Sequence, residues 1–220
     1  MSKRVPIGQS VQSAPAGQYE QMLVSAGLGP VAGADEAGRG ACAGPLVAAA
    51  VILSPDPDHE IAGLTDSKLI SPAKRDRLYP LIFEHAAAVS WVAVQARECD
   101  CMGLQVANLA ALRNAVLSLP VKPGFVVTDG FAVDGLGVPS VGMWKGDRAV
   151  RCVSAASIVA KVTRDRIMDE IDEIFPGYGF SIHKGYVTAL HQSRLEELGP
   201  CPQHRMSYGN VARAARVDPS

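Results

Sequence analysis

Four acidic residues are the side chains of this 220-residue chain that are best placed to do chemistry. They are Asp35 and Glu36 in the run GADEAGRG, Asp129 in VVTDG, and Asp147 in WKGD. Three of these positions lie at the end of an apolar run, where a strand would deliver a carboxylate to the rim of a sheet. Carboxylates gathered there repel one another and are costly to bury, and a hard cation relieves both costs. Because Mg²⁺ combines a few carboxylates with substrate phosphates, the pattern predicts metal-dependent chemistry on a phosphate ester.

A simpler interpretation is that strand ends are solvated and therefore often carry acids. The loop after the first acidic pair favours a site instead, because Gly38 and Gly40 flank Arg39 and glycine lets a backbone approach a ligand closely. Adjacent side chains on a regular strand face opposite sides of the sheet. Asp35 and Glu36 can therefore serve one site only at a bulge or at a strand end.

Seven segments occur in an order that is typical of one family: GADEAGRG, GPLVAAAVIL, GLTDSK, VVTDG, KGD, SAASIVAKVTRDR and YGFSIHKGY. Together they resemble bacterial ribonuclease HII, which cuts the RNA strand of RNA–DNA hybrids and single ribonucleotides embedded in DNA. The resemblance runs from residue 31 to residue 210, and DEAGRG with the later DG and KGD is its specific part. The chain departs from the family at Leu69, often a second lysine, and at Ala41-Cys42, often Pro-Leu. Neither departure touches a catalytic position.

The resemblance implies an RNase H-like fold, an endoribonuclease activity and two divalent ions, Mg²⁺ or Mn²⁺. It also implies a catalytic and metal-binding set that maps onto Asp35, Glu36, Asp129 and Asp147. Hydrolysis by two metal ions would then cut on the 5′ side of a single ribonucleotide in duplex DNA.

Substrate binding is expected from three further segments. The backbone of Gly38-Arg39-Gly40 is expected to approach the 2′-hydroxyl that distinguishes RNA from DNA. Tyr186 could be an incidental aromatic in a loop, but its ring can also pack on a sugar and its hydroxyl can read the 2′-hydroxyl. Ser67 and Lys68 could form an ordinary polar turn, and the resemblance implies that they hold backbone phosphates.

Composition sets limits on partners and location. The net charge is −1, with 21 basic and 22 acidic residues, which is not typical of a strong non-specific nucleic-acid binder unless basic residues cluster on one face. Five cysteines without a CxxC pair indicate reduced thiols. Since no apolar stretch approaches the roughly 20 residues of a membrane span, we expect a cytoplasmic protein. We also expect a monomer.

The apolar periodicity predicts an α/β protein with a central mixed sheet flanked by helices. Residues 1–17 are expected to be a disordered leader, residues 18–175 a catalytic core, and residues 176–220 a helical C-terminal appendage packed on that core. Strands are predicted at 31–34, 45–53, 89–96, 125–128 and 138–144, with antiparallel pairing among the first three. Helices are predicted at 19–26, 72–87 after an N-cap at Ser71, 104–119, 154–175 after an N-cap at Ser154, and 187–198.

Two other functions compete with a nuclease. Gly38, Gly40 and Gly44 nearly match a dinucleotide-binding loop, but a strand and not a helix is predicted to follow, so a nucleotide-cofactor oxidoreductase is disfavoured. A catalytically silent hybrid-binding module would not need all four acids.

Several side chains are expected to be structural and not functional. Trp91 and Trp144 are predicted to lie in the core, Lys145 to be solvated, Arg164 to belong to a charged surface face, and His191 to be structural or solvated.

Overall fold

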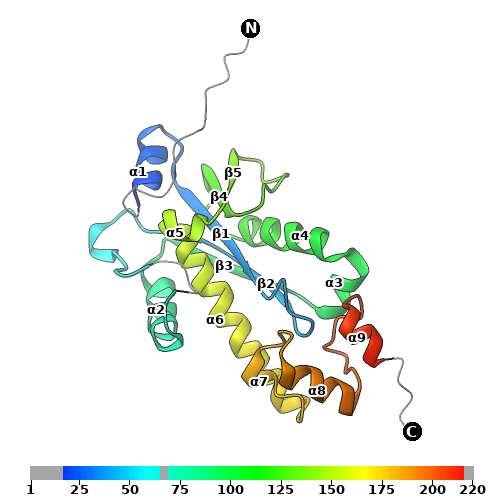
Figure 1. Ribbon diagram of the computed structural model, residues 1–220. Coiled ribbons are helices and arrows are strands. Elements are labelled where there is room, and N and C mark those ends of the chain that lie inside the picture. Colours follow the sequence, from blue (N-terminus) through cyan, green and yellow to red (C-terminus); the bar gives the residue numbers. More distant parts are fainter. Residues whose placement is uncertain (1–16, 65–68, 216–220) are drawn as a thin grey trace.

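The computed structural model describes residues 17–64 and 69–215 and arranges them as one mixed sheet with helices on both faces (Figure 1). The predicted leader, except for its last residue, lies outside the described residues, as do Ser67 and Lys68. The strand order is β3-β2-β1-β4-β5. The strands are β1 (Val31–Ala37), β2 (Leu46–Ile52), β3 (Ala88–Val94), β4 (Phe125–Asp129) and β5 (Ser140–Met143).

The pairing of the strands brings the two halves of the sheet together at β1. The predicted antiparallel pairing of the first three strands is confirmed, while β4 runs parallel to β1 and β5 runs parallel to β4. The parallel register sets Ala34 beside Thr128, so that Asp35 and Asp129 follow next to each other. Sheet pairing therefore brings together two acids that lie far apart in the sequence.

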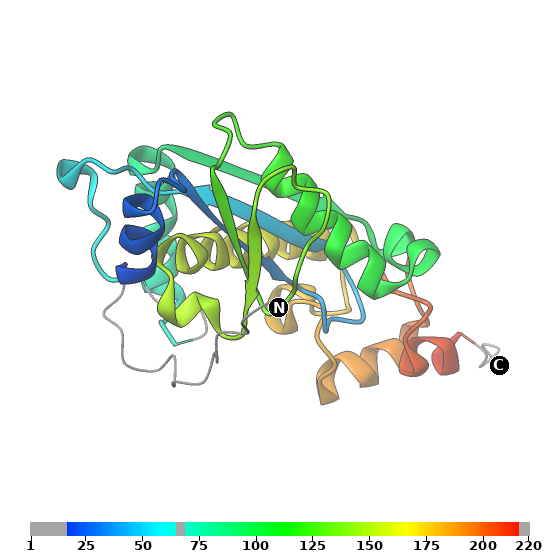
Figure 2. The same ribbon diagram turned by 90° about the horizontal axis from the view of Figure 1, so that it is seen from above.

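Both faces of β2 are buried, because side chains alternate along a strand and helices cover each side. Leu46, Ala48, Ala50 and Ile52 pack in one core cluster with α4 (Leu104–Leu117). The alternate residues, such as Val47 and Val51, pack in a second cluster with α2 (Pro72–His85) and α6 (Arg151–Ile174). Figure 2 shows the sheet from above, with these helices around it. A core of small and branched aliphatic residues allows close approach of helix and strand.

Small residues are needed where α6 crosses β1. A Cβ atom at Gly33 would collide with the backbone of Cys152 and Val153. This contact seats the first turns of α6 directly on the strand that carries Asp35.

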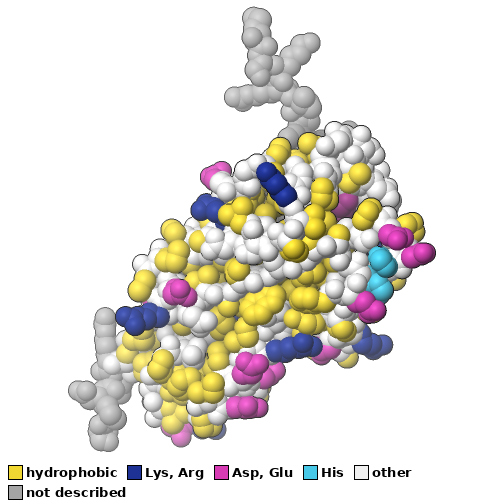
Figure 3. Space-filling model, turned by 180° about the vertical axis from the view of Figure 1, so that it is seen from behind, with side chains coloured by type: hydrophobic (Ala, Val, Ile, Leu, Met, Phe, Trp, Pro, Cys, Tyr) yellow, Lys and Arg dark blue, Asp and Glu magenta, His cyan; other side chains and the backbone are white. Residues whose placement is uncertain are grey.

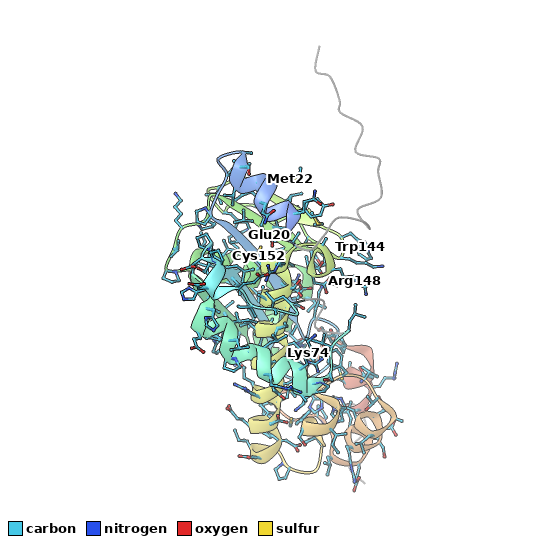
Figure 4. All side chains as sticks on the ribbon, turned by 90° about the vertical axis from the view of Figure 1, so that its left-hand side faces the viewer. Glu20, Met22, Lys74, Trp144, Arg148 and Cys152 are labelled. Carbon is cyan, nitrogen blue, oxygen red and sulfur yellow. The ribbon has the colours of Figure 1, made fainter. Side chains whose placement is uncertain are left out.

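The long helix α6 begins three residues before the predicted N-cap. Ser154 lies inside the helix, where its hydroxyl donates to the carbonyls of Asp147 (2.7 Å) and Val150 (3.1 Å). The carboxylate of Glu20 in α1 (Gln18–Ser25) instead accepts from the backbone N–H of Cys152 at 3.0 Å (Figure 4). The prediction of a Ser154 cap is wrong because an acid from another element satisfies the helix N-terminus.

The predicted Ser71 cap is confirmed, since its Oγ accepts from Lys74 N at the start of α2. The remaining helices are α3 (Ala96–Met102), α5 (Gly146–Ala149), α7 (Phe180–His183), α8 (Ala189–Leu198), α9 (Gly209–Ala214) and a 3-10 helix at Pro57–His59. The last three α-helices lie beyond the distal end of α6 (Figure 1). The division of the chain at residue 175 stays a prediction.

The two tryptophans are not in the core. Trp91 is 43% exposed and Trp144 is 79% exposed, because β3 is an edge strand and Trp144 lies in the turn after β5. Arg164, predicted on the surface, is fully buried. Figure 3 shows a face on which basic side chains lie singly among acidic and hydrophobic ones, without a continuous basic patch. Among the described residues, no helix is long and apolar enough to cross a membrane.

Candidate active site

Three of the four predicted acids meet at the end of the parallel strand pair. One carboxylate oxygen from each of Asp35, Asp129 and Asp147 lies within 4.8 Å of the other two. Asp35 comes from β1, Asp129 is the last residue of β4, and Asp147 lies in the first turn of α5. Asp35 and Asp147 are each only 3% exposed. The cluster thus holds three carboxylates close together and buries those of Asp35 and Asp147. Burial and mutual repulsion make this a costly arrangement for charged groups.

Local hydrogen bonds orient these carboxylates. Gly146 N–H donates to Asp129 Oδ1 at 2.8 Å, and Glu36 N–H donates to Asp35 Oδ1 at 2.7 Å. Lys145, with φ 58°, adopts a left-handed conformation that is uncommon for a residue with a side chain. This turn directs Gly146 at Asp129 and leads into the helix that carries Asp147. Hydrogen bonds between the carboxylates and neighbouring backbone N–H groups therefore hold both the acids and the backbone around them in place.

The electrostatics of the cluster favour a cation. The pKa of Asp35 is raised well above its usual range, first by burial and then by the negative charges of Glu36 and Asp129. Hydrogen bonds from Ser157 and from the Glu36 backbone oppose that shift only partly. A divalent ion would reverse both main causes, because it supplies positive charge to carboxylates that have lost water. The residues present therefore fit a hard metal ion with oxygen ligands.

Glu36 lies beside the triad and not within it. Its Cα pairs with Ala48, whose side chain belongs to the core on the α4 face, and it is half-buried. Its charge still raises the pKa of Asp35, so the two carboxylates are near each other. Adjacent side chains on a strand face opposite sides of the sheet, and both Asp35 and Glu36 lie within β1, Glu36 as its penultimate residue. This alternation explains why Glu36 lies beside the triad.

The loop after β1 is held by two buried arginines that the sequence did not single out. Arg164 donates to the carbonyls of Pro45 (2.9 Å), Lys184 (2.8 Å) and Ala43 (3.1 Å). A Cβ at Gly38, which has φ 84°, would collide with this guanidinium. The Gly38-Arg39-Gly40 loop is thus fixed from beneath by a side chain of α6.

Arg205, also fully buried, performs the same task from the C-terminal segment. It donates to Gly44 O at 3.1 and 2.9 Å and to Arg39 O at 3.2 Å. Among the described residues, neither this guanidinium nor that of Arg164 forms a salt bridge with a carboxylate. Backbone carbonyls therefore supply the hydrogen-bond acceptors for two buried charges.

Tyr186 belongs to the same assembly. The carbonyl of Gly185 accepts from the N–H groups of Cys42 (3.0 Å) and Ala43 (3.2 Å), which joins the residue before Tyr186 to the segment that follows the Gly38-Arg39-Gly40 loop. The Tyr186 ring is 37% exposed, and the Arg164 guanidinium lies 5.3 Å from its centre. Gly40 is exposed, while the side chain of Arg39 reaches Gln105 (3.0 Å). The structure thus brings these residues to one loop assembly beside β1.

A relay of neutral imidazoles supports Tyr186 from below. Cys201 N–H donates to His204 Nδ1 (3.0 Å), which leaves His204 Nε2 as the donor to His191 Nε2 (3.1 Å). His191 Nδ1 then carries the hydrogen that it donates to Tyr186 O at 2.9 Å. Burial lowers the pKa of both rings, and that of His204 falls to about 4. His191, predicted to be structural or solvated, is therefore structural. One choice of tautomer for each ring satisfies all three hydrogen bonds.

Solved structures of similar fold identify the class of protein. The ribonuclease H2 of Pyrococcus horikoshii superposes with a TM-score of 0.74 at 27% identity, covering 84% of this chain and 96% of that one. The RNase HII of Archaeoglobus fulgidus, solved in complex with PCNA, gives 0.70 at 26% identity, covering 81% and 94%. A mixed sheet of this kind with acids gathered at its centre defines a nuclease of the RNase H-like fold.

Sequence comparison gives the family. The ribonuclease HII profile matches residues 32–211. The ribonuclease HII of Cutibacterium acnes is 63% identical over 202 residues, which are 92% of this chain and 99% of that protein. The ribonuclease HII of Salinispora tropica is 59% identical, covering 88% and 72%. The chain belongs to the ribonuclease HII family and is a metal-dependent endoribonuclease of the ribonuclease H type, a phosphodiester hydrolase of a family that acts on RNA–DNA hybrids.

Proposed function

We propose that this enzyme cuts on the 5′ side of single ribonucleotides embedded in duplex DNA, in addition to the RNA strand of hybrids. The observation that carries the proposal is the triad of Asp35, Asp129 and Asp147, the first and last of them buried, beside a rigid glycine loop. The triad supplies a place for chemistry on a phosphate, and the loop supplies a place to recognise one sugar.

Two divalent ions, Mg²⁺ or Mn²⁺, are the proposed cofactors. Asp35, Asp129 and Asp147 would hold them, and Glu36 would complete the set from the neighbouring position on β1. When bound, such ions lower the pKa of the attacking water and stabilise the departing 3′ oxygen. Burial of Asp35 and the negative charges of Glu36 and Asp129, which raise its pKa, support this assignment, because a bound cation would offset both costs.

The protein's own part in catalysis is to hold the acids in place. Gly146 N–H fixes the orientation of the Asp129 carboxylate, and the hydroxyl of Ser157 hydrogen-bonds to Asp35. Ser154 ties the carbonyl of Asp147 to the first turn of α6. These bonds exist before substrate arrives, so little reorganisation is needed when the phosphate binds.

Recognition of the ribose is proposed for Gly38-Arg39-Gly40 and Tyr186. Phosphate contacts cannot tell RNA from DNA, so a fixed group must meet the 2′-hydroxyl. The loop meets this requirement, because the Arg39 carbonyl is itself fixed by Arg205 (3.2 Å) and by the hydroxyl of Tyr208 (2.7 Å). Tyr186 is proposed to pack on the sugar. Ser67 and Lys68, outside the described residues, are proposed to hold phosphates.

The remaining proposals concern context. A cytoplasmic monomer with a role in the removal of ribonucleotides during DNA replication and repair would suit the chain, and its five free cysteines support a reducing compartment. The core at 18–175 and the appendage at 176–220 are proposed as the two parts of the molecule.

A cleavage assay tests the main proposal. Three duplexes of one sequence would be compared in Mg²⁺, in Mn²⁺ and in EDTA: all DNA, DNA with one ribonucleotide, and an RNA–DNA hybrid. We expect metal-dependent cuts at the 5′ side of the lone ribonucleotide and no cut in all-DNA. Cleavage of the hybrid alone would refute the single-ribonucleotide activity, and binding of both substrates without cleavage would favour a silent binding module.

A further inference from the structure

The most exposed large hydrophobic side chain among the described residues lies next to the acidic triad. Trp144 is 79% exposed and directly follows Met143, the residue that pairs with Asp129 across the parallel β4–β5 ladder. Because paired strands lie about 4.8 Å apart and consecutive Cα atoms about 3.8 Å apart, the Cα of Trp144 is within roughly 9 Å of that of Asp129. Tryptophan side chains are usually largely buried, so an indole exposed to water next to the active site needs an explanation other than core packing.

The turn that carries Trp144 is fixed at both ends by Asp129 and its neighbour. Gly130 N–H donates to Met143 O at 2.9 Å, and Gly146 N–H donates to Asp129 Oδ1 at 2.8 Å. Between them Lys145 takes the left-handed conformation, and Arg148 N–H closes the turn on Lys145 O at 3.1 Å. The indole is therefore presented by rigid backbone and cannot swing away with a loose loop.

Basic residues flank the indole. Lys145 and Arg148 are both exposed, one beside Trp144 and one in the last turn of α5. In Figure 4, Trp144 and Arg148 lie close together on one side of the molecule, and Lys74 of α2 lies below them toward the middle of the view. This side is turned away from the face in Figure 3, where basic side chains lie singly. Positive charge and an exposed aromatic side by side are the combination that nucleic-acid strands bind.

We infer that Trp144 is a nucleic-acid contact of this enzyme, packing its indole on the sugar face of a nucleotide close to the cleaved bond. The inference rests on the proposed active site. In a duplex the base faces are covered by neighbouring bases, so the apolar surface left for an indole at the backbone is the sugar. Because the Cα atoms of Trp144 and Asp129 are within roughly 9 Å of each other, this sugar would belong to a nucleotide near the cleaved bond. Lys145 and Arg148 would meet the phosphates on either side.

The test uses the fact that the chain has two tryptophans. Trp91 lies on the edge strand β3, so the variant Trp91→Phe keeps Trp144 as the single indole fluorophore. This protein would be titrated in EDTA with a dye-labelled single-ribonucleotide duplex, and anisotropy would report binding while tryptophan emission reports the indole. We expect the Trp144 emission to change in parallel with anisotropy and to saturate at the same duplex concentration.

Variants separate a contact from a structural role. Trp144→Ala should weaken binding roughly five- to tenfold, at the low end of aromatic stacking, and Trp144→Phe should restore most of the loss. The slope of log affinity against log salt should stay unchanged in Trp144→Ala, because an indole neutralises no phosphate, and should fall by about 0.9 at most in Arg148→Ala. Binding with unchanged Trp144 emission, or wild-type affinity of Trp144→Ala, overturns the inference alone. Absence of any duplex binding overturns it together with the proposed function.

Discussion

Charge is handled differently at the end of β4 and beneath the loop that follows β1. At the first place, carboxylate oxygens of Asp35, Asp129 and Asp147 lie within 4.8 Å of one another, and like charges are held together. At the second, Arg164 and Arg205 are fully buried and donate to five different backbone carbonyls. The triad gains from a ligand that arrives later, whereas the arginines are satisfied already. Charges at the first place therefore serve function at a cost to stability, and charges at the second serve stability.

The largest expected effect comes from breaking the triad. Asp129→Asn should lower cleavage of a ribonucleotide-containing duplex by about three orders of magnitude or more, because it removes a proposed metal ligand. The fold should persist, and the melting temperature of the metal-free protein should stay equal or rise, since a repelling charge is lost. Cleavage rates in saturating Mg²⁺ and thermal unfolding in EDTA check both parts. Wild-type turnover by this variant would remove Asp129 from the site.

The same kind of change beneath the loop should have the opposite signature. Arg164→Met leaves the carbonyls of Ala43, Pro45 and Lys184 without their donor, and should destabilise the protein by about 3–5 kcal/mol. Urea unfolding would measure the loss, with Arg166→Met as control because that arginine lies exposed on the same helix. Equal stability of the two variants would show that the buried guanidinium does not hold the loop.

A change of pH should also affect the second region. Folding keeps His204 neutral with a pKa of about 4, while the unfolded imidazole titrates near 6.5, so the unfolded chain binds the proton first. The contribution of His204 to stability is therefore complete above pH 6.5 and is lost as the pH falls toward 4, by about 2 kcal/mol at pH 5. Urea midpoints at pH 7 and pH 5 measure this loss. His204→Gln should flatten the difference, and His59→Gln, which alters an exposed ring, should retain it.

The two regions also differ in how far the sequence predicts them. Asp129 ends the apolar strand β4, and Asp35 follows the apolar start of β1, so local patterns indicate where each carboxylate lies and sheet pairing brings the two together. Arg164 stands in a run of charged residues that is typical of a solvated helix face. Its burial depends on the carbonyls of residues 43, 45 and 184, whose arrangement exists only after the C-terminal segment has packed. Patterns within one element predict strand-end acids well and contacts between distant segments poorly.

The same limit applies to two single residues, Trp144 and Ser154. Trp144 is the last residue of the strand predicted at 138–144, but β5 ends at Met143 and Trp144 lies in the turn toward Gly146, where the indole is exposed to solvent. Ser154 has the residue type of an N-cap, but Glu20 from a different helix serves the N-terminus of α6. Neither the turn after β5 nor the capping by Glu20 can be predicted from the residues next to Trp144 or Ser154.

The smallest change that sharpens the comparison is one methyl group in the loop itself. A Cβ at Gly40 would meet no atom of the described residues within 4 Å apart from its two chain neighbours, and the φ of Gly40 lies outside the left-handed region. Gly40→Ala should therefore alter the unfolding free energy by less than about 1 kcal/mol. At Gly38 the same methyl group would collide with Arg164 at φ 84°, so Gly38→Ala should destabilise the protein clearly. If Gly40 touches the ribose, Gly40→Ala should cut a lone ribonucleotide roughly tenfold more slowly, since 1.4 kcal/mol of lost contact is a tenfold rate. A folded Gly40→Ala enzyme that cuts at the wild-type rate would place the 2′-hydroxyl sensor elsewhere. If Gly40→Ala is slow but as stable as the wild type, the methyl group acts on the substrate alone. Ribose recognition by the loop would then be distinct from the stabilisation of the loop by Arg164 and Arg205.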